Sequence, residues 1–596
     1  PLYSSAASDV YKRQQIIVDF EVLSKADFWL CCMKDVLTGK EHTIINDKKE
    51  FLRVFNKNKD SIWIGYNIKG YDQWIMKALL SNISPGAVSD AIVKRNINPW
   101  EIDSRLNKQN LYFFELSERD KSLKELELFM GEDIQESSVS FDLDRKPTPA
   151  EIEELSKYCM HDVRMTYKVF GYCFEEYESH ENLIDMFNLK ESMFGKTKAQ
   201  LSSVILGAKK PEHDRNDEFN FEILDVLNIN RYKDIVNWYK DSSNRDYKKS
   251  MSTYVYGVLT EFGWGGLHSA RKQYSAEGII IISDVRSFYP SMMIEYSLLS
   301  RNVVEPKKFS NIRDMRVELK AKKDPREKPL KKVINVTFGA SKDSNNELYD
   351  PQRANSVCVN GQLLLLDLIE KVEDVLGDRT ELIQSNTDGV AFWFETERDA
   401  EIYLQICEEW SKRTGMFLEH DRIKKVIQKD VNNYVFISDS DKPYIKSKGS
   451  YVKKLSPIDN DLPIINKALI EYLVNGTNIE DTINNADNLI DFQKCVKISR
   501  KYKKAKHGAS DINLKVLRVF ASKLPSDGAI VKVRENGSVE RIGNTPNRAF
   551  IDNGNIIGKK VPDKLDKQWY IDLAQKRLLE FLPNAQYEYT LFDMLN

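Results

Sequence analysis

The chain has 596 residues and a formal net charge of −2 at pH 7, with 88 Lys and Arg against 90 Asp and Glu. At about 150 residues per domain, this length holds roughly four domains or two large ones. Hydrophobic residues make up 41% and charged residues 30% of the chain, which is typical of a globular protein, and no apolar run approaches the about 18 residues that predict a membrane span. The seven cysteines form no CxxC pair, which argues against a zinc ribbon or a disulfide scaffold and predicts a cytoplasmic protein. Taken alone, the near-zero charge argues against nucleic acid as a partner.

The first residues, PLYSSAASDVYKRQ, are polar and lack the apolar segment of a secretory signal. They resemble a translated sequencing adapter, and an ordinary flexible terminus is the alternative. We therefore expect residues 1–14 to be a non-native or disordered leader. The fold is expected to begin at about Ile16, with no further domain before it.

In chain order, the first predicted elements are a buried strand at 16–22, a second strand at 61–68 and a helix at about 72–80. A longer helix is predicted over 149–170, with Thr148 as its N-cap and Pro149 at its first position. Residues 171–255 are mixed and polar, and we interpret them as a connecting region with helical segments.

The strongest strand signal in the later part is GIIIISDV at 278–285, and a hairpin is predicted over 382–394 with its turn at 386–389. Three helices are predicted between that strand and the hairpin, at about 311–323, 328–338 and 354–375. After about residue 450 the pattern becomes helical and basic, with a β-like patch near 528–552.

Asp19 and Glu21 form the first acidic pair, on the first predicted strand. Residues i and i+2 of a strand point to the same face, and two unpaired carboxylates there are costly to bury. A divalent cation resolves this cost. For the pair alone, two salt-bridged edge residues are the favoured alternative. Further acidic positions change that balance: Asp72 lies at a strand-to-helix junction, and Tyr158 shares a helix face with Asp162 at i, i+4.

These positions, in this order, resemble the three motifs of DnaQ-like 3′–5′ exonucleases: DxE, then an Asn followed by Tyr-Asp, then Yx3D. The resemblance implies phosphodiester hydrolysis with two metal ions. It implies metal ligands at Asp19, Glu21, Asp72 and Asp162, water orientation by Tyr158, primer-end contacts by Asn67 and Tyr71, and a single-strand contact by Ser122 and Leu123. Val22 departs from the family, where a Thr often contacts the terminus.

A second set of chemically suggestive residues lies in the later half. Asp284 ends the strongest strand, in DVRSFYPSMM, and Asp388 lies in the hairpin turn. Between them, Lys331, Asn335 and Phe338 fall at i, i+4 and i+7 on one helical face. Each piece has a plain alternative: a helix cap, ordinary Asp-Gly turn chemistry, and a solvated Lys face.

Together these segments resemble the family B DNA polymerases, most closely the compact phage type. DVRSFYPS is similar to motif A, KVINVTFG with Lys331 to motif B, and SNTDGV to motif C, in family order and after an exonuclease. The resemblance implies an α/β and α+β multidomain fold, with an RNase H-like exonuclease domain followed by palm, fingers and thumb. The expected boundaries are 15–175 exonuclease, 176–260 connection, 261–300 and 346–445 palm, 301–345 fingers, and 446–596 thumb.

The resemblance also implies a mechanism of primer extension with dNTPs. Asp284, the backbone of Val285 and Asp388 would bind two Mg²⁺ ions, for which Mn²⁺ can substitute. Lys331 would neutralise the triphosphate, assisted by Lys320 or Arg316. The backbone of Arg286, Ser287 and Phe288 would bind the triphosphate. Tyr289 would stack on the sugar and exclude a 2′-OH. Asn335 and Phe338 would contact the base pair.

Several positions depart from the family pattern. Asn386 replaces the first Asp of motif C, Gly389 replaces its Ser, and Val336 and Phe338 replace the Ser and Tyr of motif B. After motif C, Tyr434 matches the KxY element, but Asn432 stands at the Lys position and Lys429 is a candidate replacement. The segment 263–272 resembles a template-contacting loop, with Gly265, Gly266 and Arg271 as contacts.

Charge is segregated along the chain. Segment 301–332 has a local charge of +7, segment 114–154 one of −8, and KISRKYKKAK at 497–506 has six basic residues and no acid. We expect the basic segments to contact DNA phosphates, including Arg500, Lys501 and Lys503; a solvated helix face is the alternative. Since 47 residues separate Asp284 from Lys331 and 49 separate Gly339 from Asp388, there is little room for the insertions of protein-primed relatives. This spacing predicts oligonucleotide priming and poor strand displacement.

The leading prediction is therefore a proofreading DNA-directed DNA polymerase of phage-type replication, monomeric and without a membrane anchor. Its expected partners are primer–template DNA and dNTPs, with a helicase, single-strand-binding protein or processivity factor as further candidates. The alternatives are an exonuclease or a DNA-binding protein with a degenerate polymerase site. A reverse transcriptase is disfavoured by the exonuclease and by motif B.

Overall fold

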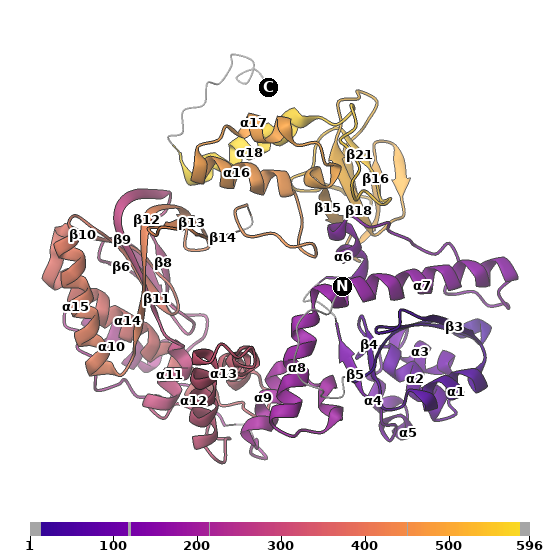
Figure 1. Ribbon diagram of the computed structural model, residues 1–596, viewed down its shortest axis with the longest axis horizontal. Coiled ribbons are helices and arrows are strands. Elements are labelled where there is room, and N and C mark those ends of the chain that lie inside the picture. Colours follow the sequence, from indigo (N-terminus) through magenta and orange to yellow (C-terminus); the bar gives the residue numbers. More distant parts are fainter. Residues whose placement is uncertain (1–12, 117–120, 214, 450, 584–596) are drawn as a thin grey trace. The chain divides into compact units, whose positions relative to one another are not determined.

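The structure is a computed structural model that describes residues 13–583 except 117–120, 214 and 450. It is a mixed α/β, multidomain protein with several sheets (Figure 1). The chain divides into two compact units. The first unit comprises residues 13–197, 455–463 and 487–566, and the second comprises 198–454, 464–486 and 567–583. The segment predicted as the thumb, 446–596, is thus divided between the units. Among the described residues, no helix is long and apolar enough to cross a membrane.

Within the described part of the first unit, a five-stranded sheet has the order β3-β2-β1-β4-β5. Strand β2 is antiparallel to both β1 and β3, whereas β4 runs parallel to β1 and β5 parallel to β4. The strands are β1 (Gln15–Leu23), β2 (Phe28–Asp35), β3 (Glu41–Ile45), β4 (Ile62–Gly65) and β5 (Phe113–Glu115). The predicted strands at 16–22 and 61–68 are confirmed as β1 and β4.

The sheet of the first unit is buried on both faces because β1 alternates between two cores. Ile17 packs into one core with Leu155 and Val163, and Val18 packs into the other with Phe51 and Ile75. The helices of this part are α1 (Lys48–Lys57), α2 (Asp72–Leu80), α3 (Pro85–Val93), α4 (Pro99–Ile102), α5 (Ser104–Asn107), α6 (Leu123–Met130), α7 (Pro149–Tyr172) and α8 (Phe174–Met186). Asp19 and Glu21 share the face of Ile17, which α7 covers.

The N-terminus of α7 is capped by the residues that the sequence predicted. The Thr148 side chain accepts a hydrogen bond from the backbone N–H of Glu151, and the Glu151 side chain accepts from the N–H of Thr148. This reciprocal capping satisfies two amides that the first helical turn leaves unpaired. Pro149 follows as the first helical residue, so the predicted start is confirmed.

Two residues of the predicted leader, Arg13 and Gln14, contact the first unit. Arg13 Nη2 lies 2.8 Å from Asp185 Oδ1, and the N–H of Ile62 donates to the carbonyl of Gln14. These two residues of the expected leader therefore belong to the first unit. Residues 1–12 lie outside the described part of the chain.

The C-terminal part of the first unit is β-rich, which confirms the β-like patch predicted near 528–552 and corrects the helical expectation for 494–521. One sheet has the order β15-β18-β21 and the other β17-β16-β19-β20. The strands are β15 (Lys494–Lys497), β16 (Tyr502–His507), β17 (Ser510–Ile512), β18 (Val516–Ala521), β19 (Ile530–Arg534), β20 (Val539–Arg541) and β21 (Ala549–Ile551). The basic run 497–506 thus forms a strand-turn-strand segment and not a helix.

Arg518 on β18 connects this β-rich part to the rest of the first unit. Its side chain is fully buried, and its guanidinium donates to the carbonyls of Leu128 (3.0 Å), Glu132 (3.0 Å) and Gly554 (2.7 Å). Leu128 belongs to the last turn of α6, whose carbonyls have no partner within the helix. A cation is favourable there because the helix dipole is negative at its C-terminus.

The described part of the second unit is built on a nine-stranded antiparallel sheet of order β14-β13-β12-β9-β11-β10-β8-β7-β6. Its strands are β6 (Met251–Val255), β7 (Val258–Phe262), β8 (His268–Ala270), β9 (Tyr274–Val285), β10 (Thr380–Ser385), β11 (Gly389–Phe394), β12 (Leu418–Asp430), β13 (Asn433–Ser438) and β14 (Ile445–Lys448). The predicted strand at 278–285 and the hairpin at 382–394 are confirmed as β9 and β10–β11.

The helices of the second unit follow the predicted pattern around the break at Asp324-Pro325. They are α9 (Lys198–Leu206), α10 (Lys233–Lys240), α11 (Phe288–Glu295), α12 (Lys307–Ala321), α13 (Glu327–Lys342), α14 (Pro351–Leu376), α15 (Glu397–Thr414), α16 (Pro463–Asn475), α17 (Ile479–Asn485) and α18 (Lys567–Phe581). Helix α14 is buried along most of its length, so it forms the core against which α11 and α13 pack.

Candidate active sites

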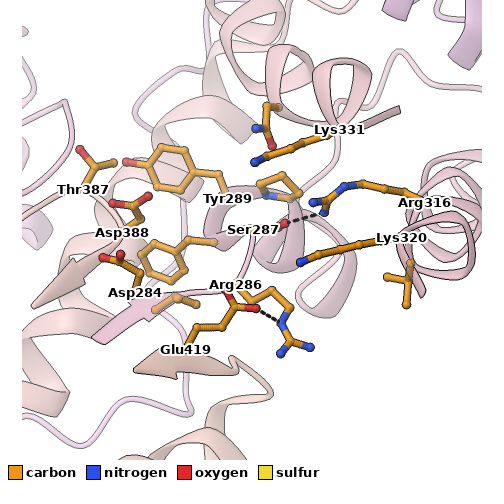
Figure 2. A pocket seen from close by; sticks show the side chains of 15 residues that line it. Asp284, Arg286, Ser287, Tyr289, Arg316, Lys320, Lys331, Thr387, Asp388 and Glu419 are labelled. Carbon is orange, nitrogen blue, oxygen red and sulfur yellow. Dashed lines mark hydrogen bonds and ion pairs between the residues drawn. The ribbon is translucent and has the colours of Figure 1, made fainter. Parts of the chain in front are cut away.

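A cavity of about 610 Å³ in the second unit contains most of the residues predicted around Asp284 and Asp388 (Figure 2). Asp284 ends β9 and Asp388 lies in the turn before β11, and the two strands are direct neighbours. The N–H of Val285 donates to the carbonyl of Asp388 at 2.7 Å, which fixes the two acidic positions side by side. The predicted residues that line the cavity are Asp284, Val285, Arg286, Ser287, Phe288, Tyr289, Lys320, Lys331, Asn335 and Asp388.

The cavity has an acidic side and a basic side. Figure 2 shows Asp284 and Asp388 on one side, with Lys331, Lys320 and Arg316 on the other. Burial and the charge of Asp284 raise the pKa of Asp388 above its ordinary value. A buried carboxylate next to a second one, opposite several ammonium and guanidinium groups, suits a divalent cation bound together with a polyphosphate.

Phe338 lies behind Tyr289 rather than in the cavity wall. The two ring centroids are 4.4 Å apart, which is the contact range of aromatic pairs. On α14, a Cβ at Gly361 would lie 3.2 Å from the Tyr289 ring, so a glycine there lets the ring pack closely. Burial raises the pKa of the Tyr289 hydroxyl, which therefore stays protonated.

The structure corrects one part of the expected phosphate cradle. The backbone N–H of Arg286 donates to the carbonyl of Phe417 at 2.8 Å, so it is not free for a ligand, and its side chain forms an ion pair with Glu419 at 2.9 Å. Ser287 is the N-cap of α11, with φ of 47°. The amides that follow it are in the first helical turn, where no intrahelical acceptor exists.

Glycine at position 389 has a direct packing reason. A Cβ there would lie 2.2 Å from Oδ1 of Asp284 and 2.7 Å from the carbonyl of Ser283, far inside van der Waals contact. The carboxylate of Asp284 thus occupies the space that a side chain at 389 would need. The departure from the family pattern at this position is coupled to the observed position of Asp284.

Sequence reasoning missed Lys446, which lies on β14 with its Nζ 3.1 Å from Oδ2 of Asp284. Tyr434, which the sequence did single out, lines the same small cavity as Lys446, Asp284 and Asn386. No motif marks Lys446, because it approaches Asp284 only through the pairing of β13 with β14 and of β12 with β9. The cavity residues Pro290, Val317, Thr387 and Glu419 were missed as well.

Two cations predicted to contact DNA are engaged within the second unit. Lys429 forms an ion pair with Glu580 on α18, and the guanidinium Nε of Arg271 donates to the carbonyl of Leu382 at 2.8 Å. Lys429 thus joins β12 to α18, and Arg271 joins the end of β8 to β10. Their contacts with DNA stay predictions.

The glycine loop at 263–266 is anchored to both α14 and the motif C turn. Gln362 Nε2 donates to the carbonyl of Gly265 at 2.9 Å. A Cβ at Gly266 would lie 2.5 Å from Oγ1 of Thr387, so only glycine allows this approach. The loop thus lies beside the turn that carries Asp388, and its contact with the template stays a prediction.

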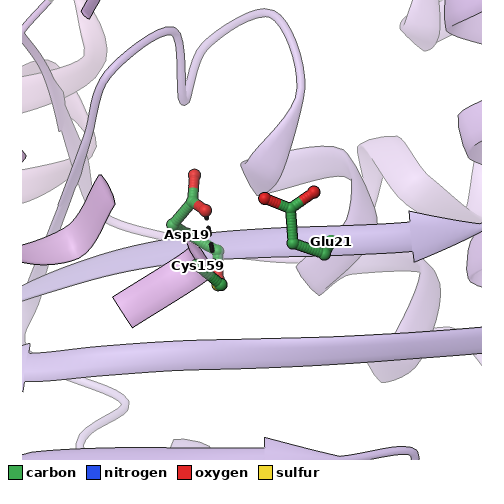
Figure 3. A group of neighbouring side chains, drawn as sticks. All are labelled: Asp19, Glu21 and Cys159. Atoms are coloured by element: carbon green, nitrogen blue, oxygen red, sulfur yellow. Dashed lines mark hydrogen bonds between the residues drawn. The ribbon is translucent and has the colours of Figure 1, made fainter. Parts of the chain in front are cut away.

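A second cluster, in the first unit, brings together Asp19, Glu21, Asp72 and Asp162. Figure 3 shows the Asp19 and Glu21 side chains on the same side of β1. Asp72 Oδ1 accepts the N–H of Phe20 at 3.2 Å, which places Asp72 beside β1. Burial and the charge of Asp162 raise the pKa of Asp19 to about 8, and burial raises that of Asp162 to about 6.

The remaining two carboxylates of the cluster are perturbed in the same direction. Burial, followed by the charges of Asp19, Asp162 and Asp72, raises the pKa of Glu21 well above its usual range, and burial with the charge of Asp19 does the same for Asp72. Ligand atoms of Asp19, Glu21 and Cys159 lie within 4.8 Å of one another. Four crowded carboxylates that resist ionisation fit divalent metal ions, since oxygen ligands are those that Mg²⁺ and Mn²⁺ prefer.

Sequence reasoning also missed Lys124, a cation in this cluster. Its Nζ lies 2.5 Å from Oδ1 of Asp162 and 3.1 Å from Oε1 of Glu127, and 4.8 Å from the ring centre of Tyr158. Lys124 directly follows Ser122-Leu123, so its position next to a predicted contact was the available signal. Glu127 is fully buried, and nothing in the local sequence indicates that.

Several residues that were predicted to contact the nucleic-acid end form hydrogen bonds within the first unit. The hydroxyl of Tyr71 hydrogen-bonds that of Ser89 at 2.8 Å, and Asn67 has a positive φ of 64° with its N–H on Glu115. Ser122 caps α6, and its hydroxyl donates to Glu125. Leu123 packs against the core.

Arg500, Lys501 and Lys503 are exposed at the start of β16. The Nζ of Lys501 lies 5.1 Å from the ring centre of Tyr502. By position they belong to the unit of the Asp19 cluster and not to that of Asp284.

Comparison with known proteins gives little beyond overall likeness. No family model matches the chain, and no curated protein matches it in sequence. Among solved structures, a family B DNA polymerase from the hyperthermophilic archaeon Pyrobaculum calidifontis is 14% identical, with a TM-score of 0.44. The match covers 97% of this chain and 79% of that one.

Proposed function

We propose that the chain is a DNA-directed DNA polymerase that extends a primer 3′-OH with dNTPs, and that its first unit carries a 3′–5′ exonuclease. One observation carries the proposal: a single cavity places Asp284 and Asp388, on neighbouring strands, opposite Lys331, Lys320 and Arg316. Phosphoryl transfer depends on positioning and charge neutralisation. A cavity with metal-ligand carboxylates on one wall and polyphosphate-binding cations on the other offers both.

The polymerase role assigns a task to each wall of the cavity. Asp284 and Asp388 would hold two Mg²⁺ ions, which supply charge neutralisation and activation of the 3′-OH when bound. Lys331 and Lys320 bind the triphosphate, and the first-turn amides of α11 after Ser287 add neutral donors. Tyr289, fixed against Phe338 at 4.4 Å, stacks on the deoxyribose and excludes a 2′-OH, while Asn335 contacts the base pair.

The exonuclease role rests on the first cluster. Asp19, Glu21, Asp72 and Asp162 would hold the divalent ions, which generate the attacking hydroxide when bound. Tyr158, on the same face of α7 as Asp162, orients the attacking water. The sheet order β3-β2-β1-β4-β5, with β4 parallel to β1, supports an RNase H-like domain in this part.

Domain roles follow from these assignments. In the second unit, the nine-stranded sheet serves as the palm, α12 and α13 as the fingers, and α16 to α18 as a thumb. The β-rich part 487–566, with Arg500, Lys501 and Lys503, serves the exonuclease unit as a nucleic-acid surface. Helices α12, α13 and α14 fill most of the chain between Lys307 and Leu376, which leaves little room for an insertion and supports oligonucleotide priming and weak strand displacement. Phage-type replication and a monomeric state are further parts of the proposal and rest on the sequence resemblance.

An exonuclease or DNA-binding protein with a degenerate polymerase site is the second candidate. Asn386 at a family Asp position and the ion pair between Lys446 and Asp284 favour it, because both reduce the negative charge available to metal ions. The first cluster would then be the working site of the chain.

A primed single-stranded template with Mg²⁺ and dNTPs separates the two candidates. The wild type should extend the primer, and Asp284→Ala should lose extension while still degrading the primer. Asp19→Ala should show the reverse, and Glu261→Ala, which removes an exposed carboxylate on β7, should change neither. Extension that survives Asp284→Ala would contradict the polymerase role. Degradation that survives Asp19→Ala would contradict the exonuclease role.

A further inference from the structure

Both oxygens of Asp284 have close neighbours in the second unit. Oδ2 lies 3.1 Å from the ammonium of Lys446, and Oδ1 faces Gly389 so closely that a Cβ there would lie 2.2 Å away. A divalent cation needs carboxylate oxygens as its ligands. Ion binding at Asp284 therefore has to displace or share the ammonium of Lys446.

The charge of Lys446 acts on the whole carboxylate pair. Burial lowers the pKa of Lys446, but the charge of Asp284 and the hydrogen bond to it outweigh burial and raise that pKa. The same ammonium opposes the rise in the pKa of Asp388 that burial and Asp284 cause. Lys446 thus places a positive charge beside the two carboxylates, on a side chain that is 39% exposed.

Asn386 explains why Lys446 pairs with Asp284. Asn386, Lys446 and Asp284 line one small cavity. The Asn386 side-chain oxygen accepts the N–H of Thr387 at 3.1 Å, and the amide is neutral. A carboxylate at position 386 would offer Lys446 a second anionic partner, whereas the amide leaves Asp284 as the stronger attraction for the ammonium.

We propose that Lys446 is an exchangeable counter-ion of the second site: it holds Asp284 while no divalent ion is bound and competes with the ion for that carboxylate. The inference rests on the proposed two-ion site and deepens it. Ion loading and the release of Lys446 are then one coupled equilibrium. The site binds ions more weakly than its carboxylates alone would allow, and it stays assembled without them.

Mn²⁺ binding without DNA tests this competition directly. The full-length chain would carry Asp19→Asn and Glu21→Gln to disable the first cluster, and free Mn²⁺ would be followed by electron paramagnetic resonance. Lys446→Met should bind Mn²⁺ roughly five-fold more tightly, the effect of removing a half-exposed ion pair. Lys446→Arg keeps the charge and should stay near the wild type. Lys448→Met removes the same charge two residues along β14 and should change little, because Lys448 acts only over a longer distance.

A second variant probes the role of Asn386. Asn386→Asp should also tighten Mn²⁺ binding, partly by drawing Lys446 away from Asp284. In the Lys446→Met background there is no ammonium to draw away. The effects of the two substitutions on Mn²⁺ affinity should therefore not be additive. Full additivity would show that the new carboxylate acts on the ion alone and would contradict the exchange.

The outcomes separate this inference from the proposed function. Unchanged or weaker Mn²⁺ binding by Lys446→Met, or equal tightening by Lys448→Met, overturns the counter-ion role. Mn²⁺ binding that Asp284→Ala leaves intact overturns the two-ion site itself, and with it the polymerase proposal. Circular dichroism of each variant confirms folding, and tighter binding by Lys446→Met cannot arise from a misfolded site.

Discussion

In the first unit, Asp19, Glu21, Asp72 and Asp162 lie together with the buried Glu127. The ammonium of Lys124 contacts Asp162 and Glu127, and the imidazole of His161 lies 3.5 Å from Glu127. In the second unit, four cationic side chains line the cavity beside Asp284, Asp388 and Glu419. The first cluster is thus strongly anionic without metal ions, whereas the second is nearly balanced by the protein itself. Burial amplifies the difference, because low dielectric strengthens repulsion among the first four carboxylates.

The two clusters thus differ in how their negative charge is balanced when no metal ion is bound. The first cluster stores electrostatic repulsion, which divalent ions relieve when they bind, so its ion affinity and the stability of its unit should be coupled. In the proposed function, the basic groups of the second site bind the substrate, while Lys446 pairs with Asp284. Its stability should depend little on ions. The following tests address that contrast, beginning with the largest expected effect.

Removing Lys124 should upset the first cluster most. Lys124→Met leaves Asp162 and the fully buried Glu127 without their ammonium partner, and breaking a buried pair on one side costs about 3 kcal/mol of unfolding free energy. Urea unfolding in EDTA measures the loss of unfolding free energy. Repeating the measurement with Mn²⁺ shows how much of that free energy the ion restores. Lys157→Met, which removes an exposed ion pair with Glu153 on α7, should change stability by less than about 0.5 kcal/mol. Equal effects of the two variants would contradict a special role for Lys124.

A substitution at Gly389 should damage the second site alone. Gly389→Ala places a Cβ where Oδ1 of Asp284 now lies, so the carboxylate has to move by about 1 Å, and primer extension should fall about a hundred-fold. Primer degradation by the first unit should remain. Gly543→Ala is the control, since a Cβ there meets nothing within 4 Å and the residue has no assigned role. Full extension activity by Gly389→Ala would show that Asp284 has another productive position.

The ion-free stability of the first unit should fall as pH rises. The folded pKa values of Asp19 (about 8) and Asp162 (about 6) lie above their ordinary values near 4, so the folded state holds more protons than the unfolded state between pH 4 and 8. Stability is then greatest at the acidic end of this window and is lost as the groups ionise. In EDTA the melting temperature should drop by a few degrees over this range, and Mn²⁺ should restore it. A chain with Asp19→Asn and Glu21→Gln should show a flatter profile; the same slope in both chains would contradict this explanation.

The smallest expected effect concerns the exposed basic residues of β16. Lys503→Gln should weaken single-stranded DNA binding slightly and reduce the slope of log affinity against log salt by about 0.7, the value for one phosphate contact. Lys157→Gln, on α7 of the same unit, is the control. An unchanged slope for Lys503→Gln would indicate a solvated side chain rather than a DNA contact.

Much of the fold was predictable where the local pattern is strong. The apolar run at β9, the Asp-Gly turn between β10 and β11, and the capping signal of Thr148 and Pro149 each determine structure within a few residues, and each prediction is confirmed. The region after residue 450 was predicted less well. There, basic residues that have no strong strand propensity are held in β16 by pairing with β17 and β19, which local sequence does not encode.

The sequence by itself indicated the carboxylates of the two candidate sites and Lys331, because their side chains lie at fixed offsets on strands, turns and helices whose periodicity is local. The tertiary structure decided which charges meet them. Lys124 and Lys446 reach Asp162 and Asp284 only through helix packing and strand pairing, and Lys429 and Arg271 are engaged by Glu580 and Leu382 for the same reason. Electrostatic energy depends on distance in space and on burial, and neither is set by distance along the chain.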